Sequence, residues 1–501
     1  PRKRPEGWGA FLPLAGGGER KAGREAGKGG KEKKVKRESP EEQRKQMLEA
    51  PIPGLIGRLA VPTIISMLVT SIYNMADTYF VSQLGTSASG AVGVIFSAMA
   101  IIQAVSFMIG MGAGTHVSQA LGAGNREKAD AYASTSFFTA FIVGVILAFF
   151  SLTNIDAVVR FLGSTETIAP YAKDYATYIF YAMPFMMCSF VMNNLLRFEG
   201  LTMYGMVGIT AGGILNIVLD PILIFALDMG TAGAALATAL SQVVSFCILL
   251  TMCNTKADAL SIRFSHFKPS LRIYGGICYN GIPSLGRQGI ASISNILLNN
   301  AVGVYGDAAI AAMSIVCRYA MFINSSVIGF GQGFQPVCGA AFGAKQTARC
   351  QEAYRFCQRV AIAFSLATGL AFFVFAPALA ARFAPDAQSA EAARRALRLQ
   401  SVAFPAQSAV ILMTMLTQAM GLTLRASLVA TSRQALFFLP LLAVLPRLFG
   451  LWGLLACQSA SDLAALGFSL ALTRRLRGSS SARCGCSDAR TACRSHPRSS
   501  S

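Results

Sequence analysis

The sequence predicts an all-α polytopic membrane protein with twelve transmembrane helices in two pseudo-symmetric six-helix lobes. Composition is the first reason: 53% of the 501 residues are hydrophobic and only 14% are charged, whereas soluble domains carry about 25% charged residues. The second reason is a series of apolar segments of roughly 20 residues or longer, the length that a helix needs to cross a bilayer core. The third is an internal repeat that relates the two halves of the chain.

The apolar segments are expected to be helices because lipid offers the backbone no hydrogen bonds and the segments show no alternation of apolar and polar residues. We expect twelve spans: 55–83, 89–118, 131–152, 174–196, 203–227, 230–252, 274–304, 308–338, 357–380, 397–420, 424–446 and 448–473. The lobes would then occupy 54–255 and 274–476, joined by a linker at 256–273. Basic, disordered tails are expected at 1–53 and 477–501.

The repeat appears when the chain is compared with itself at an offset of 221 residues. Fourteen of the 63 positions from Pro62 to Gly124 are then identical, against about five expected by chance. Matched landmarks include Pro62 with Pro283 and Gly112 with Gly333. Both halves begin on the same side of the membrane, so the repeat is parallel. Parallel six-span halves around a central cleft are an architecture of transporters.

The basic residues indicate the orientation. Lys and Arg gather in both tails and in the short loops on one side of the membrane, with 382–398 as an exception. By the positive-inside rule, both termini are expected to be cytoplasmic, in a multi-pass protein of the cell (inner) membrane. A nucleic-acid partner is not expected from the net charge of +20, because the charge lies largely in tails and loops and not on one folded domain.

Ionisable residues within the spans are the candidate functional residues, because burying each in a membrane costs at least about 2–3 kcal/mol. The first half carries Asp77 and Asp220, and Asn216 lies four residues before Asp220 on the same helix face. Thr238 in the next span could add an oxygen. Two carboxylates with neutral oxygens suit a proton or Na⁺, a hard cation. At the 221-residue offset the second half has Leu or Phe opposite Asp77, Asn216 and Asp220.

Other charges inside the spans receive weaker assignments. Arg287, Arg318 and Asp462 are candidate cleft or inter-lobe charges, and Asp462 could pair with Arg433 or Arg287. Arg318 needs a partner because it lies well inside its span. For Arg197, at the end of the fourth span, we favour a structural role.

Several stretches of the sequence resemble the multidrug and toxic compound extrusion (MATE) family, bacterial type. They are Gly57–Pro62 and Asp77–Val81 in the first span, Leu215–Pro221 in the fifth, and Gly230–Ser241 in the sixth. The resemblance covers roughly residues 54–476 and is specific as a combination of stretches.

The resemblance implies a central cleft and export of cationic or amphipathic compounds by alternating access, in exchange for H⁺ or Na⁺. It implies no enzymatic activity and no cofactor beyond the coupling ion. By match, Asp77, Asn216, Asp220 and Thr238 would be the ion ligands, with Na⁺ as a metal they could hold, and Pro62 would be the bend point of the first helix. We expect a monomer whose partners are small-molecule drugs or toxins and the lipid bilayer.

Three alternatives stay open at this point. A lipid-linked oligosaccharide flippase of the same superfamily should have a strongly cationic cleft for pyrophosphate, against which the paired acids speak. A membrane-embedded enzyme should show a nucleophile with its base or a cluster of metal ligands, but the chain has only three His. A structural or receptor protein would not need a buried pair of carboxylates.

Overall fold

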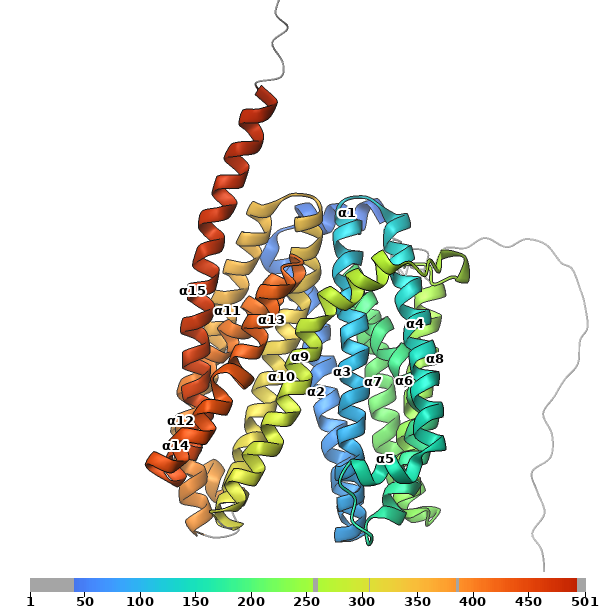
Figure 1. Cartoon of the computed structure of the whole chain (residues 1–501), viewed down its shortest axis with the longest axis vertical. Helices are drawn as coiled ribbons and strands as arrows, with labels where there is room; N and C mark the ends of the chain where they lie inside the picture. The colour runs from blue at the N-terminus through green and yellow to red at the C-terminus, as the bar shows by residue number, and fades with distance from the viewer. Residues whose placement is uncertain (1–39, 256–259, 306, 384–386, 493–501) are drawn as a thin grey trace, which may run out of the picture. The chain divides into compact units, whose positions relative to one another are not determined.

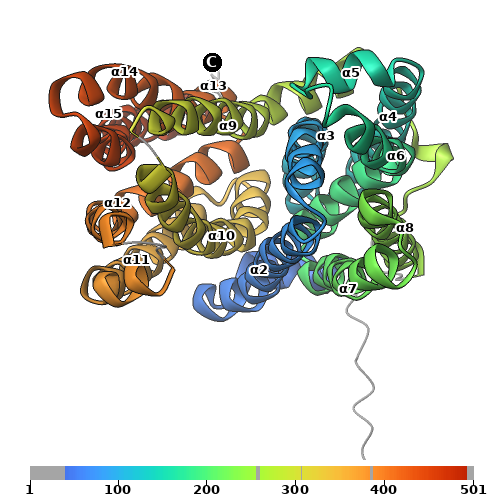
Figure 2. The same ribbon diagram turned by 90° about the horizontal axis from the view of Figure 1, so that it is seen from below.

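The computed structural model of the protein describes residues 40–255, 260–305, 307–383 and 387–492, and every regular element in those ranges is a helix. The helices form two bundles that lie side by side (Figures 1 and 2). The predicted all-α fold with two lobes is confirmed.

The first lobe contains α2 (Ile52–Ser82), α3 (Thr86–Gly122), α4 (Arg126–Thr153), α5 (Ile155–Phe161), α6 (Ala169–Glu199), α7 (Thr202–Pro221), the π-helical turn η1 (Ile222–Ala226) and α8 (Gly230–Thr255). The second lobe contains α9 (Leu271–Gly303), α10 (Asp307–Gly343), α11 (Thr347–Phe383), α12 (Ala387–Ala419), α13 (Thr423–Thr431), the π-helical turn η3 (Ser432–Leu436), α14 (Phe438–Phe449) and α15 (Leu451–Ala492). A short helix α1 (Pro40–Glu49) precedes the first lobe, and a 3₁₀ turn η2 (Phe264–His266) lies between the lobes.

Each of the twelve expected spans coincides with a long helix, or with a run of helix and π-helical turn in the fifth and eleventh spans. Ten helices of the described chain are long and apolar enough to cross a membrane by length and composition. The other two spans correspond to α9 and α10, which are 33 and 37 residues long. The helix α2 continues through Pro62, so the expected bend point is not a break in this structure.

The two predicted tails need correction where the structure describes them. Helix α1 occupies 40–49, inside the range expected to be disordered, and α15 continues to Ala492, past the expected end of the second lobe. The remaining tail residues, 1–39 and 493–501, lie outside the described chain. The tail prediction was wrong for 40–49 because the burial of Met47 among core residues of the second lobe is a tertiary contact that composition does not reveal.

The lobes meet along a seam of glycines, which we call the glycine seam, at the end of the bundle where α1 lies (the α1 end; Figure 1). A Cβ atom on Gly122 of α3 would lie 2.1 Å from the carbonyl oxygen of Ala340 in α10. A Cβ atom on Gly343 of α10 would lie 2.0 Å from the carbonyl oxygen of Gln119 in α3. The two contacts are related by the offset of 221 residues, so the repeat is also present in the packing between the lobes.

A second pair of contacts in the glycine seam is also related by the offset of 221 residues. Gly112 of α3 approaches α9 so closely that a Cβ atom would lie 3.1 Å from the amide nitrogen of Gly281. Its counterpart Gly333 of α10 approaches α2, where a Cβ atom would lie 2.5 Å from the Cα atom of Ala60. Small residues allow such close crossings of helix backbones, and in membranes this packing holds helices together. The repeated glycines therefore join the two lobes.

Helix α1 and the linker add contacts at this end. The Arg44 Nε atom donates a hydrogen bond to the Gly122 carbonyl of the first lobe, 3.0 Å away. Arg349 of α11, in the second lobe, donates to the Met47 carbonyl at 3.1 Å and to the Ala50 carbonyl at 2.6 Å. The segment from α1 to the start of α2 is therefore bound to both lobes.

The linker is attached to the first lobe. Asp130 of α4 accepts a hydrogen bond from the Ser261 amide at 3.1 Å, and Lys268 pairs with Glu127 of α4 at 2.9 Å. The part of the linker after residue 259 therefore packs along α4.

Replacing Gly281 by Ala should weaken the glycine seam. The new methyl group would lie 2.1 Å from the Met108 carbonyl oxygen, and overpacking of this kind costs about 1–3 kcal/mol. We expect a lower melting temperature in detergent and faster hydrogen–deuterium exchange at the α1 end of α3. Gly289→Ala on the same helix is the matched control, since a Cβ atom there has nothing within 4 Å. Equal effects of the two substitutions would contradict the role given to the seam.

Candidate functional site

Two carboxylates lie buried inside the first lobe. Asp77 on α2 is 3% exposed, and Asp220, in the last turn of α7, is fully buried. Asn216, one turn earlier on α7, donates to Asp220 at 3.1 Å and to the Thr238 hydroxyl of α8 at 3.3 Å. Asp77 and Asp220 are close enough to interact electrostatically. The structure thus brings together the four residues expected to form the ion site.

A tyrosine of another helix adjoins the two carboxylates. The Tyr175 hydroxyl of α6 donates to the Asp77 carboxylate at 3.4 Å, and Tyr175 lies near Thr238 and Asp220. Tyr175 is completely buried. Four helices of the first lobe, α2, α6, α7 and α8, therefore each contribute a side chain to one polar cluster.

Helix α7 ends at Pro221, directly after Asp220, and the sequence explains why it ends there. Pro221 follows Asp220 directly and has no amide hydrogen, so it cannot continue the regular hydrogen-bond ladder. The chain continues as the π-helical turn η1 from Ile222 to Ala226. Such turns occur frequently at functional sites, and this one begins immediately after the buried carboxylate.

Several oxygens of this region lack a hydrogen-bond partner among the described residues. The buried atoms are one carboxylate oxygen each of Asp77 and Asp220, the Asn216 amide oxygen, and the hydroxyls of Ser241 and Ser245. Native proteins leave few buried polar atoms unsatisfied, and each such atom calls for an explanation. A group of carboxylate, amide and hydroxyl oxygens is what a proton or a hard cation requires.

A small cavity adjoins this cluster. Its volume is about 20 Å³, and its lining includes Asn216, Thr238, Ser241, Gln242 and Ser245. A cavity needs about 10–15 Å³ to hold one water, so the space suits a single water or a small cation. The cluster can therefore accept a proton on a carboxylate or hold one cation among oxygens.

The sequence reasoning missed three contributors to this region. Tyr175 lies near the polar start of the fourth span, where nothing in the local pattern distinguishes it. Ser241 and Ser245 had a usable signal, because Thr238, Ser241 and Ser245 follow one another at three and four residues and so share one face of α8. That polar stripe in an apolar helix could have been recognised.

The candidate charges of the second lobe lie in different surroundings. Asp462 of α15 is completely buried and pairs with Arg433 of η3, one of the two partners considered from the sequence. Arg287 of α9 is half-buried, next to a second cavity that Arg433 also lines. The Arg318 side chain is exposed and makes no hydrogen bond or ion pair with the described residues, so the partner expected for it is not found there. These residues do not join the carboxylate cluster.

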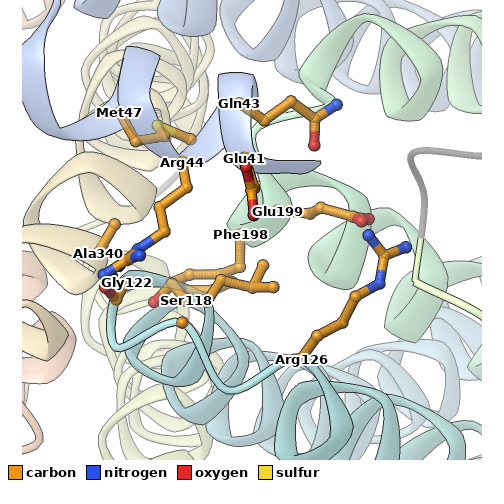
Figure 3. Close-up of a pocket in the computed structure, with 12 residues that line it drawn as sticks. Glu41, Gln43, Arg44, Met47, Ser118, Gly122, Arg126, Phe198, Glu199 and Ala340 are labelled. Carbon is orange, nitrogen blue, oxygen red and sulfur yellow. Dashed lines mark hydrogen bonds between the residues drawn. The ribbon is translucent and has the colours of Figure 1, made fainter. Parts of the chain in front are cut away.

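A cavity of about 510 Å³ lies at the α1 end (Figure 3). Its lining comes from α1, α3, α4, α6 and α10. Figure 3 shows the side chains of Arg126 and Glu199 pointing toward one another and Arg44 reaching toward Gly122. Neither Asp77 nor Asp220 is among the lining residues given for it, and its own lining carries charges of both signs. This cavity is therefore separate from the carboxylate cluster.

The fold and the buried cluster define the class: a twelve-helix membrane transporter built of two repeated lobes. The MatE family model matches residues 62–222 and 283–444, and together the two segments cover more than half of the chain. This chain belongs to the MatE family, which confirms the resemblance inferred from the motifs. The matched segments begin 221 residues apart, at the offset of the internal repeat.

Individual relatives agree with this assignment. The multidrug export protein MepA of Staphylococcus haemolyticus is 27% identical over 422 residues, covering 83% of this chain and 93% of its own length. An outward-facing structure of a multidrug resistance MATE family transporter superposes with a TM-score of 0.81 at 28% identity, covering 86% of this chain and 98% of its own. A transporter of the same superfamily from Pyrococcus furiosus, described as having a binding pocket of reverse polarity, gives a TM-score of 0.81 at 27% identity, with 86% and 97% covered.

Asp462→Asn should destabilise the second lobe. The substitution leaves the guanidinium of Arg433, which is 15% exposed, without its carboxylate partner, and breaking a buried ion pair from one side costs about 3–5 kcal/mol. We expect a clear fall in melting temperature in detergent. The double replacement Arg433→Met with Asp462→Leu should recover most of it. Asp228→Asn, at an exposed loop residue, is the control. A wild-type melting temperature for Asp462→Asn would rule out a stabilising pair.

Proposed function

We propose that this protein is a cation-coupled multidrug efflux antiporter, which exports cationic or amphipathic compounds by alternating access in exchange for H⁺ or Na⁺. The observation that carries the proposal is the buried cluster of Asp77, Asp220, Asn216 and Thr238. Two carboxylates so close together in an apolar lobe repel one another, and a bound proton or Na⁺ relieves that repulsion. The relatives that carry multidrug export in their names support the choice of substrate.

The proposed coupling depends on unequal binding of the ion to the two transport states. Asp77 lies on α2, which also forms part of the glycine seam through Ala60. Loading of the carboxylates would change the packing of α2, and Pro62, which lacks an amide hydrogen, is the position where this helix bends at the lowest energetic cost. Ion binding would thereby lower the affinity for the drug and favour its release.

The orientation completes the proposal. We place the α1 end at the cytoplasmic side of a cell (inner) membrane, with both termini cytoplasmic and the protein acting as a monomer. The glycine seam closes the lobes at this end, so the structure would correspond to a state closed to the cytoplasm. Its similarity to an outward-facing relative supports this interpretation.

The flippase alternative receives one observation in its favour. Arg287 and Arg433 line a cavity of the second lobe, which is therefore basic. Its volume is about 40 Å³, enough for one anionic group and not for a pyrophosphate with attached sugars. The buried carboxylates of the first lobe also have no role in holding a pyrophosphate. Antiport therefore remains the better proposal.

Asp77→Asn and Asp220→Asn should each reduce gradient-driven efflux by about tenfold or more, since both remove a group that must gain and lose a cation or proton. Transport of a fluorescent cation by purified protein in proteoliposomes with an imposed gradient measures the effect. Asp174→Asn is the matched control, because Asp174 is exposed and lies next to Tyr175. Normal gradient-driven efflux by both Asp77→Asn and Asp220→Asn would contradict the proposed coupling.

Separately imposed gradients identify the ion. A pH gradient alone or a Na⁺ gradient alone should drive efflux of the same fluorescent cation by the wild-type protein. Thr238→Val removes a neutral oxygen that a metal ion uses and a proton does not need, so it should weaken Na⁺-driven efflux far more than H⁺-driven efflux. If neither gradient drove efflux, coupling through this cluster would be refuted.

A further inference from the structure

A second polar site lies in the other lobe, and the proposed ion coupling does not use it. Arg287 of α9 lines a cavity together with Arg433 and Gln434 of η3, Thr414 of α12 and Met111 of α3. The first four belong to the second lobe, while Met111 closes the cavity from the first lobe. The site therefore lies at the boundary between the lobes.

The charge at this site is not balanced. Arg433 pairs with Asp462, which neutralises it. Arg287 has no hydrogen bond and no ion pair with any residue that the structure describes, and the charged side chains near it, Arg433 and Arg197, are both cationic. Within a membrane protein an unpaired cation is costly and usually marks a functional site. Arg287 therefore contributes a positive charge that no anionic side chain of the described residues neutralises.

A second arginine reinforces the positive charge. Arg197 of α6 is only 2% exposed and interacts electrostatically with Arg287. Its guanidinium contacts the Met111 Sδ atom at 2.8 Å and the amide oxygen of Asn194, and no carboxylate among the described residues pairs with it. Met111 thus stands between two arginines. The structural role that we favoured for Arg197 stays a prediction, and its charge adds to the positive potential at the cavity.

The walls of the cavity are held in place. Arg433 and Gln434 lie in the π-helical turn η3, a kind of turn that recurs at functional sites. The carbonyl oxygen of Arg433 accepts a hydrogen bond from Ser461 of α15, and that of Gln434 accepts one from Ser294 of α9 at 3.0 Å. The backbone of the turn is therefore held by hydrogen bonds from both neighbouring helices.

The cavity is of the right size for one small charged group. Its volume is about 40 Å³, roughly the room of a few waters, which suits a carboxylate. Arginine presents its donors in a planar fork that matches the two oxygens of a carboxylate. The Thr414 hydroxyl lies in the same lining and offers a further polar contact.

We propose that the cavity around Arg287, Arg433 and Gln434 is a subsite for the anionic group of an amphipathic substrate. The substrate class is a zwitterion: a carboxylate held by the second lobe on a molecule whose cationic part faces the cleft. The inference rests on the proposed efflux function and extends it by naming a recognised group. Separation of the lobes would remove Met111 from the cavity and open the subsite to the cleft.

The test compares two rhodamines that differ in one group: the zwitterion with a free carboxylate and its methyl ester, which is a cation. Binding to the full-length protein in detergent is measured by fluorescence polarisation without any gradient. Arg287→Gln should weaken binding of the free acid by about tenfold or more, the usual effect of losing a hydrogen bond to a charged group. The ester should bind within about twofold of the wild type.

Two further variants separate charge from structure. Arg287→Lys keeps the positive charge and should retain part of the preference for the free acid. Arg447→Gln, at an exposed position of α14 in the same lobe, should bind both dyes like the wild type. Melting temperatures show whether each variant is folded.

Three results would overturn the inference. Equal weakening of both dyes by Arg287→Gln would make Arg287 a structural residue, and unchanged binding of the free acid would remove it from the site. Strong competition of chloride with the free acid, absent in gluconate, would assign the subsite to an inorganic anion. Because binding needs no gradient, each of these results can occur while Asp77→Asn still abolishes coupled efflux, so the two proposals fail separately.

Discussion

The close approach of helix backbones along the glycine seam is the constraint on which the rest of the structure depends. Gly122 and Gly343 lie where α3 and α10 come so near that a Cβ atom at either position would collide with a backbone carbonyl of the other lobe. The contact occurs twice because Gly122 and Gly343 occupy equivalent positions of the internal repeat. It determines which faces of the lobes meet, and hence that Met111 covers the basic cavity of the second lobe. A contact made of backbone and glycine can also separate without breaking ion pairs, as two lobes that rock against one another would require.

The second general feature is the separation of charge between the lobes. Among the described residues, Asp77 and Asp220 of the first lobe have no cationic partner, and Arg287 of the second lobe has no anionic partner. An unpaired charge inside a membrane-spanning helix is expensive, most of all for the buried Asp77 and Asp220, so stability does not explain either arrangement. The two proposals give each charge a ligand of the opposite sign: a proton or cation for the acids and an anionic group for the arginine. The two lobes share their glycines but differ in the polar residues that they carry.

Much of the fold could be predicted from the sequence, because the relevant signals are local. The length of an apolar segment predicts a spanning helix, and an offset in the positions of Pro and Gly predicts a repeated lobe. The cluster of Asp77, Asn216 and Asp220 could be found for the same reason, since an acid inside an apolar segment is conspicuous. The helix α1 could not be found, because its polar sequence is held by tertiary contacts: the burial of Met47 and the hydrogen bonds of Arg44 and Arg349.

The sequence by itself determined the twelve helices, their grouping into two halves, and the half that carries the acids. The tertiary structure alone decided which side chains meet. The Tyr175 hydroxyl of α6 reaches Asp77 of α2 only in the folded lobe. Asp462 pairs with Arg433 because α15 packs against η3, and no described residue pairs with Arg287. The physical reason is that the pattern along a helix sets which face is polar, whereas the partner of that face depends on helix crossings between residues far apart in the chain.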